Sequence, residues 1–249
     1  MQIVVLYIYF ALVGTLVYGL CRLLKLNPVY PKINRPRLSA ICALIAVLAS
    51  MLVVTLLMMS SGNHRHAATH NAVHRYNLIP QMFLVILYCL PMALMLRLNR
   101  ETLRSTGLTT SNFWKAIVVG LFLAATTLVT ARGGPFAGLR GLDSQRLQAL
   151  LYFGIVGFGE EFLFRGYLQS RIVAWLGQIR GLGLASAIMA LAHIPNRILG
   201  LGMDLPHALA SSAGLVAISL LCGFVMLRTG SVVAPAIFHA FADWAHHST

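Results

Sequence analysis

Eight stretches of this chain are apolar enough to enter a lipid bilayer, and most are long enough to cross it. A spanning helix needs about 20 largely apolar residues, because lipid offers no partner for backbone N–H and C=O groups. The candidate spans are Ile3–Cys21, Leu38–Met59, Leu78–Leu96, Ala116–Ala131, Leu147–Tyr167, Leu182–His193, Ala208–Leu227 and Ser231–Ala245. The sequence therefore predicts an all-α fold, a polytopic membrane helix bundle with about eight transmembrane helices.

Some of these segments need comment. The first is long for a signal-peptide core and is interpreted as a retained helix. Leu182–His193 is only half a span, and we expect Ile172–Leu176 to lie along the membrane surface and extend it. Ser231–Ala245 is short and carries several polar residues.

The composition agrees with a membrane protein. Of the 249 residues, 58% are hydrophobic and 10% charged, whereas soluble domains carry about 25% charged residues. The net charge of +13 would suggest nucleic acid if the cations formed one basic face. They fall between the apolar runs instead, which is typical of topology signals and of contact with anionic lipid. The predicted partner is the lipid bilayer, and no nucleic acid is predicted.

The loops between the spans carry unequal charge. Loops 22–37 and 97–115 are the most basic, so the positive-inside rule predicts that both are cytoplasmic. Alternation then places loop 60–77 and both termini outside and segment 168–181 inside, although the three arginines of loop 132–146 argue against this order. Short loops and a compact chain favour a bacterial inner membrane.

Two adjacent carboxylates, Glu160 and Glu161, interrupt the apolar run Leu147–Tyr167. A charged side chain at that depth costs about 2.5–3.5 kcal/mol on insertion scales, so a functional reason is expected. Residues i and i+4 share a face of a helix, which predicts that Glu161 pairs with Arg165.

Two histidines of later spans are predicted to meet these carboxylates. At about 1.5 Å per residue, Glu160, His193 and His239 each fall in the cytoplasmic half of a membrane about 30 Å thick. They are therefore expected to form one site that opens to the cytoplasm. His239 and Asp243 are a further i, i+4 pair.

At these residues the sequence resembles the CPBP family, the type II CAAX prenyl endopeptidase, bacteriocin-processing and Abi-like group of intramembrane proteases. The family's EExxxR motif is matched by Glu160-Glu161-Phe162-Leu163-Phe164-Arg165. Its FxxxH motif is matched at His193, with Met189 where Phe is usual, and its third motif by His239 and Asp243. The resemblance runs from about Leu147 to the C-terminus. It divides the chain into residues 1–146, with about four N-terminal transmembrane helices, and residues 147–249, a catalytic four-helix core.

The resemblance implies an intramembrane endopeptidase acting on a membrane-embedded or lipid-modified peptide or protein. Glu160 would activate the attacking water with help from His193. His239 and Asp243 would stabilise the oxyanion, while Glu161 and Arg165 would organise the site. This scheme requires no cofactor. A metal such as zinc stays open, because a glutamate and two histidines can bind it, although the chain contains no HExxH motif.

Other interpretations of the same residues also stay open. Glu160 and Glu161 could form structural ion pairs with Arg165 and Arg171. The chain could be a non-proteolytic membrane scaffold or immunity protein with this fold, or a proton-coupled transporter whose buried Glu and His relay protons. A second histidine group is expected to lie in a solvated outer loop, and whether it binds anything is left open; it comprises His64, His66, His70 and His74.

Overall fold

The apolar runs fold as helices, as the sequence predicts. A computed structural model describes residues 2–29, 32–60, 76–130, 134–136, 139–140 and 142–247, and every regular element within these ranges is helical. The long elements are α1 (Gln2–Leu23), α2 (Pro36–Ser60), α3 (Leu78–Leu98), α4 (Phe113–Val129), α5 (Ser144–Glu161), α6 (Ser170–Leu176), α7 (Gln178–Ala192), α8 (Leu205–Thr229) and α9 (Val233–His247). The short ones are η2 (Leu103–Thr106), η4 (Phe162–Gln169) and η5 (Asn196–Gly200).

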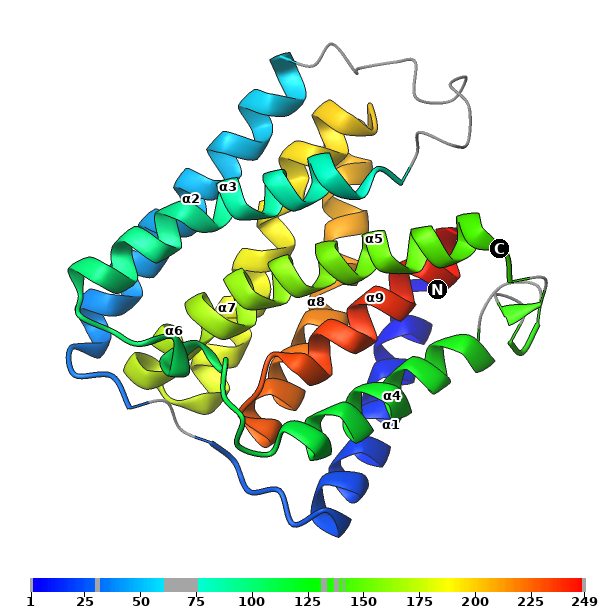
Figure 1. Cartoon of the computed structure of the whole chain (residues 1–249), viewed down its shortest axis with the longest axis horizontal. Helices are drawn as coiled ribbons and strands as arrows, with labels where there is room; N and C mark the ends of the chain where they lie inside the picture. The colour runs from blue at the N-terminus through cyan, green and yellow to red at the C-terminus, as the bar shows by residue number, and fades with distance from the viewer. Residues whose placement is uncertain are drawn as a thin grey trace.

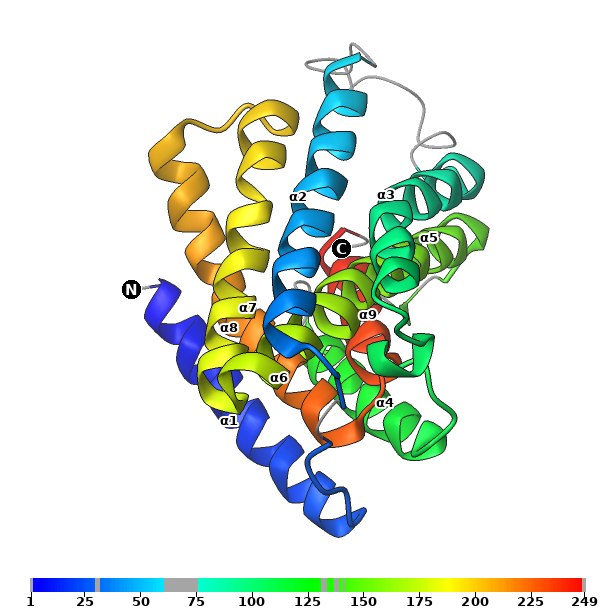
Figure 2. The ribbon, with the colours of Figure 1, turned by 90° about the vertical axis from the view of Figure 1, so that its left-hand side faces the viewer.

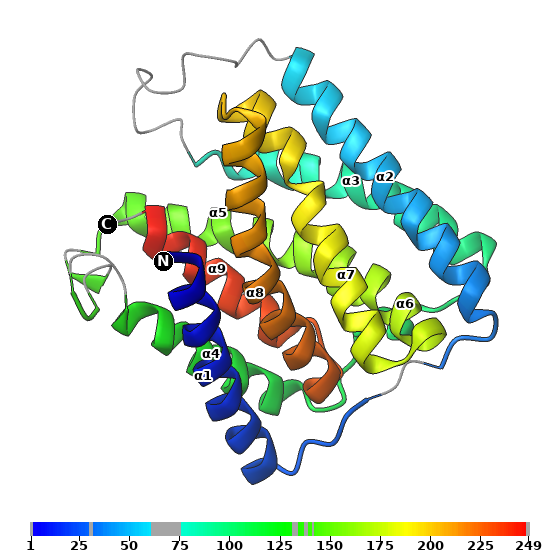
Figure 3. The same ribbon diagram turned by 180° about the vertical axis from the view of Figure 1, so that it is seen from behind.

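The helices form two packed layers. In one layer α3, α5, α9 and α4 lie side by side, and this layer faces the viewer in Figure 1. In the other, α1, α8 and α7 follow one another, as the view from behind shows (Figure 3), and α2 packs against α6 and η5. Figure 2 shows the molecule from the side, with α2 packed against α3. The two layers thus enclose the interior from both sides.

One long helix connects the layers. Segments α5, η4 and α6 are continuous from Ser144 to Leu176, so the expectation that Ile172–Leu176 lies on the membrane surface was wrong. Its middle part, η4, is π-helical, a geometry that is rare and frequently found at functional sites. The helix ends at Gly177, where a φ of 80° suits glycine.

Six helical segments of the described residues are long and apolar enough to cross a membrane, namely Ile3–Leu23, Pro36–Leu57, Leu78–Leu98, Ser144–Leu176, Gln178–Gly200 and Leu205–Thr229. Two of the predicted spans are helices of fewer than 18 residues and are not among these six. Helix α4 has 17 residues and α9 has 15, or about 26 and 23 Å. The protein is therefore a multi-pass integral membrane protein, and α4 and α9 complete its bundle as shorter helices.

The basic loops gather at one end of the bundle, here called the basic end. The Val29 N–H donates to the Leu227 carbonyl at 2.7 Å, and the Asn112 side chain contacts the Thr229 carbonyl at 3.4 Å. This end carries 12 of the 19 Lys and Arg residues, namely Arg22, Lys25, Lys32, Arg35, Arg37, Arg97, Arg100, Arg104, Lys115, Arg171, Arg180 and Arg228. Both ends of the chain lie at the opposite end (Figure 1).

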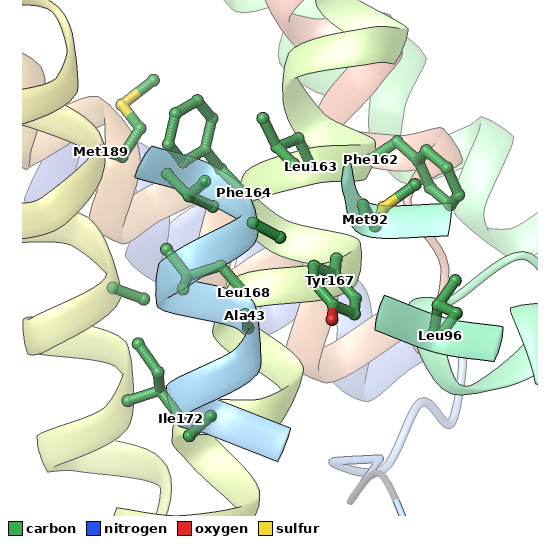
Figure 4. Close-up of a cluster of buried hydrophobic side chains, with 14 of the residues drawn as sticks. Ala43, Met92, Leu96, Phe162, Leu163, Phe164, Tyr167, Leu168, Ile172 and Met189 are labelled. Atoms are coloured by element: carbon green, nitrogen blue, oxygen red, sulfur yellow. The ribbon is translucent and has the colours of Figure 1, made fainter. Parts of the chain in front are cut away.

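A buried apolar cluster fixes the stretch that follows the two glutamates. Phe162, Leu163 and Phe164 pack there against Tyr88 of α3 and Met189 of α7, with alanines of α2 filling the gaps (Figure 4). Leu163 and Phe164 are 0 and 2% exposed. Because close packing leaves these side chains little freedom, the end of α5 is held rigidly.

Candidate active site

The structure brings all six predicted site residues into one cluster. They come from three separate parts of the fold: the α5–η4 helix, the end of α7 and the middle of α9. The residues are Glu160, Glu161, Arg165, His193, His239 and Asp243.

Glu160 lies between the two imidazoles. Its Oε2 is 3.4 Å from Nε2 of His193 and 3.9 Å from Nε2 of His239. Its side chain is 27% exposed, the largest exposure of any acidic group on α5 or η4. Glu160 is therefore the carboxylate of this pair that water can reach.

Glu161 has the opposite environment. It is 0% exposed, and its Oε2 is 3.2 Å from Nε of Arg165, which is 2% exposed. Its Oε1 is 3.0 Å from Nδ1 of His239. A carboxylate enclosed in this way has no contact with solvent, so its role is to order Arg165 and His239 around it.

The geometry at His193 defines how its ring is oriented. Nδ1 lies 2.8 Å from the Met189 carbonyl oxygen, which can only accept, so Nδ1 carries the hydrogen and Nε2 faces Glu160. The Phe164 ring packs 6.3 Å from the imidazole. Because a backbone carbonyl holds the ring, methionine at position 189 supplies this contact as well as phenylalanine would, and its buried side chain belongs to the apolar cluster.

His239 and Asp243 lie on the α9 side of Glu160. Nε2 of His239 is 3.4 Å from Oδ2 of Asp243, the i, i+4 contact that helical spacing predicts. An ionised carboxylate has no hydrogen to donate. Asp243 can therefore orient His239 but, when ionised, cannot itself donate to an oxyanion.

A cavity of about 310 Å³ opens beside Glu160. Its walls come from α2, α3, α5, η4, the end of α7 and the residues that follow it: Met51, Val54, Thr55, Gln81, Leu84, Tyr88, Tyr152, Val156, Glu160, Leu163, Phe164, Ala192, His193, Pro195 and Asn196. His239 and Asp243 are not among its walls. Any substrate in this cavity therefore meets Glu160 and His193 first.

The cavity lies in the half of the molecule away from the basic end. Thr55 is near the end of α2 and Gln81 near the start of α3, and both points are remote from the basic loops. The expectation that the site lies in the half facing those loops was wrong. Because the helix continues to Leu176, Glu160 is 16 residues, or about 24 Å, from each end of it.

Sequence reasoning missed the contribution of the N-terminal helices. Residues 1–146 were placed outside the catalytic core, yet Met51 and Thr55 of α2 and Gln81 and Tyr88 of α3 line the cavity. The sequence signal for this contribution was the presence of isolated polar residues, such as Thr55 and Gln81, in otherwise apolar helices. The second histidine group, at positions 64, 66, 70 and 74, lies outside the described residues.

The donor set at the site does not match a metal centre. Within the ranges that the structure describes, no group of three or more His, Cys, Asp or Glu side chains is arranged to hold a metal ion. Glu161 and Asp243 are both directed at His239. No step of the chemistry below is therefore assigned to a metal.

Comparison with known families supports the resemblance noted in the sequence. A family model described as Rce1-like, type II CAAX prenyl endopeptidase, matches residues 143–245. This part of the chain is similar to that family. The Rce1-like region begins at the residue that caps α5, ends within α9 and contains all six site residues. It supports a membrane protease of the CAAX type. Neither a curated protein nor a solved structure matches the chain.

Proposed function

We propose that the protein is an intramembrane endopeptidase that hydrolyses a peptide bond of a membrane-associated substrate with a water activated by Glu160. One observation carries this proposal. Of two adjacent carboxylates, only Glu160 borders the cavity, and it lies 3.4 Å from an imidazole nitrogen that is free of backbone partners. A general base must lie within hydrogen-bond or single-water reach of its proton, and a water that contacts both Glu160 and His193 from the cavity would meet that condition.

The reaction follows from these positions. Glu160 removes a proton from the water, and the resulting hydroxide forms a bond to the carbonyl carbon of the peptide. The C=O electrons move onto oxygen and give a tetrahedral oxyanion. Its collapse breaks the C–N bond, and protonated Glu160 returns the proton to the departing nitrogen. His193 Nε2 holds the water during attack and its Nδ1–H stays on the Met189 carbonyl.

The remaining site residues act around this step. His239, fixed between Glu161 and Asp243, offers an N–H toward the oxyanion, and one such donor is worth about 3–4 kcal/mol. Arg165 pairs with Glu161 and holds it in place. Asp243 orients the imidazole. No cofactor takes part in this scheme.

The substrate class follows from the location of the site. The cavity lies deep among apolar helices, so a substrate reaches it from lipid as a membrane-embedded or lipid-modified peptide or protein. The family description supplies the first probe, a peptide ending in a prenylated Cys-aliphatic-aliphatic-X sequence. The proposed location is a bacterial inner membrane, and no nucleic acid is a partner.

The test compares cleavage by the wild type, Glu160→Gln and His193→Ala in proteoliposomes. The probe is an internally quenched, farnesylated Cys-aliphatic-aliphatic-X peptide, with a proteome-wide search for new termini in membranes as a second readout. We expect each variant to lose about 10²–10⁴-fold in rate, the usual contribution of a general base. Matched controls are Asp204→Asn and His207→Ala, since both side chains are more than half exposed and neither lines the cavity.

The outcomes separate the possible functions. Equal yields of new termini from all five proteins would end the proposed mechanism and favour the scaffold or transporter function. A chelator is added in a parallel arm. Unchanged rates support the metal-free scheme, whereas a loss that zinc restores would contradict it.

A further inference from the structure

Tyr88 of α3 carries a buried hydroxyl with no hydrogen-bond partner. The residue is 6% exposed, and its backbone carbonyl accepts a 2.5 Å bond from the Ser50 hydroxyl of α2, which fixes this part of α3. A buried polar group left unpaired costs about 1–3 kcal/mol, and phenylalanine would fill the same space without that cost. The hydroxyl therefore needs a reason other than packing.

The hydroxyl lies next to the reactive carboxylate. Tyr88 is one of the walls of the cavity that contains Glu160 and His193. Its oxygen occupies the space beside Gly159, where a Cβ would overlap it. Glycine immediately before Glu160 thus allows a phenol from another helix to approach the backbone of α5 at the point where the base is carried.

The proposed reaction can use a hydrogen-bond donor at this point of the cavity. Peptide hydrolysis develops negative charge on the carbonyl oxygen, which preorganised donors stabilise. Asp243, when ionised, accepts only. His239 is the one donor assigned to the oxyanion so far, and it lies outside the cavity walls, so a second donor within the walls would share the developing charge. Tyr88 offers an O–H donor that nothing else in the described structure uses.

We infer that the Tyr88 hydroxyl donates a hydrogen bond to the carbonyl oxygen of the peptide bond under attack and stabilises the oxyanion that forms there. The inference rests on the proposed function. It also makes α3, which lies outside the family-matched residues 143–245, a contributor to the catalytic chemistry.

The test is Tyr88→Phe, measured with the farnesylated quenched peptide in proteoliposomes. We expect kcat to fall about 10²–10³-fold, as for loss of one oxyanion donor, with KM changed less than about twofold, because the bond is strongest in the transition state. The Tm should be unchanged or higher, since the lost hydroxyl has no partner. A merely structural role would instead lower the Tm and leave kcat per folded molecule unaltered.

Tyr167→Phe is the matched control. Tyr167 is also buried, its hydroxyl also lacks a partner, and it belongs to the same apolar cluster, but it does not line the cavity. We expect wild-type kcat from this variant. Tyr88→Phe with wild-type kcat, while Glu160→Gln is inactive, would overturn the inference and leave the proposed function intact. If the wild type and Glu160→Gln give the same yield, the function fails and the inference falls with it.

Discussion

Two neighbouring glutamates perform different tasks because their surroundings differ. Glu161 is enclosed between Arg165 and His239, while Glu160 borders the cavity. Removing one partner of a buried ion pair leaves an uncompensated charge and costs about 3–5 kcal/mol. The same change at a partly exposed residue leaves water to solvate its neighbours.

Glu161→Gln is therefore expected to lower the Tm strongly, because buried Arg165 loses its counter-charge. Glu160→Gln is the adjacent control and should lower the cleavage rate about 10²–10⁴-fold with little change in Tm. Thermal unfolding of both purified variants in the same detergent measures the contrast. Equal Tm values would contradict the division of roles between the two carboxylates.

Helical spacing predicted the pairs within one helix but not the contacts between helices. The i, i+4 rule is enough for Glu161 with Arg165 and for His239 with Asp243. The contact of His239 with Glu161 depends on how closely α9 approaches α5. Gly157 allows that approach, because a Cβ there would lie 3.2 Å from the His239 Cβ. Nothing local to the sequence of α9 encodes it.

At the scale of elements, a charged cluster around Arg171 and Glu101 links α6 to the loop after α3. Arg171 is 0% exposed and donates to Glu101 at 3.0 and 2.6 Å and to the Ser105 carbonyl at 3.1 Å. Glu101 also accepts from Ser39 of α2. Arg171 thus pairs with Glu101, whereas the sequence had suggested Glu160 or Glu161 as its structural partner.

Glu101→Gln is expected to lower the Tm by less than Glu161→Gln does, because Arg171 keeps the carbonyls of Ser105, Gly166 and Tyr167 as acceptors. The cleavage rate per folded molecule should stay unchanged, since Arg171 is 11 residues, or about 16 Å, along the helix from Glu160. Arg104→Gln, at an exposed residue of the same loop, serves as the control. A large loss of rate in Glu101→Gln at full folding would show that the cluster is coupled to the site.

The main error of the sequence prediction concerned the length of the central helix, which continues to Leu176 instead of ending at Tyr167. The predicted span included Arg165 but ended at Tyr167, before Arg171, and charges in lipid are costly. Each is neutralised within the protein, by Glu161 and Glu101, so the helix continues through both. Only the tertiary partners reveal this, because Glu101, the counter-charge of Arg171, lies outside its helix.

At the scale of the whole molecule, the cavity and the basic loops lie at different depths. The basic end carries 12 of the 19 cations, and the cavity walls come from the half nearest the opposite end. With α5, η4 and α6 counted as one helix, successive helices run in opposite directions (Figures 1 and 3), as the alternation in the sequence prediction requires. The structure differs from the sequence prediction in the depth of the site, because the cavity lies in the half of the molecule away from the basic end.

The positive-inside rule then predicts that substrate is cleaved in the half of the membrane away from the cytoplasm. Alkaline phosphatase is active only outside the cytoplasm, so its fusion after His247 should be active in a bacterial inner membrane. A fusion within the loop between α3 and α4 should be inactive, and fluorescent-protein fusions at the same points, which fold only in the cytoplasm, should give the reverse. The opposite pattern would place the cavity on the cytoplasmic side and would mean that the cations at the basic end do not set the orientation. Both fusions are measured in the same membrane. A chain that fails to insert gives no phosphatase activity at either point, whereas a chain inserted in the opposite orientation gives activity only in the loop between α3 and α4.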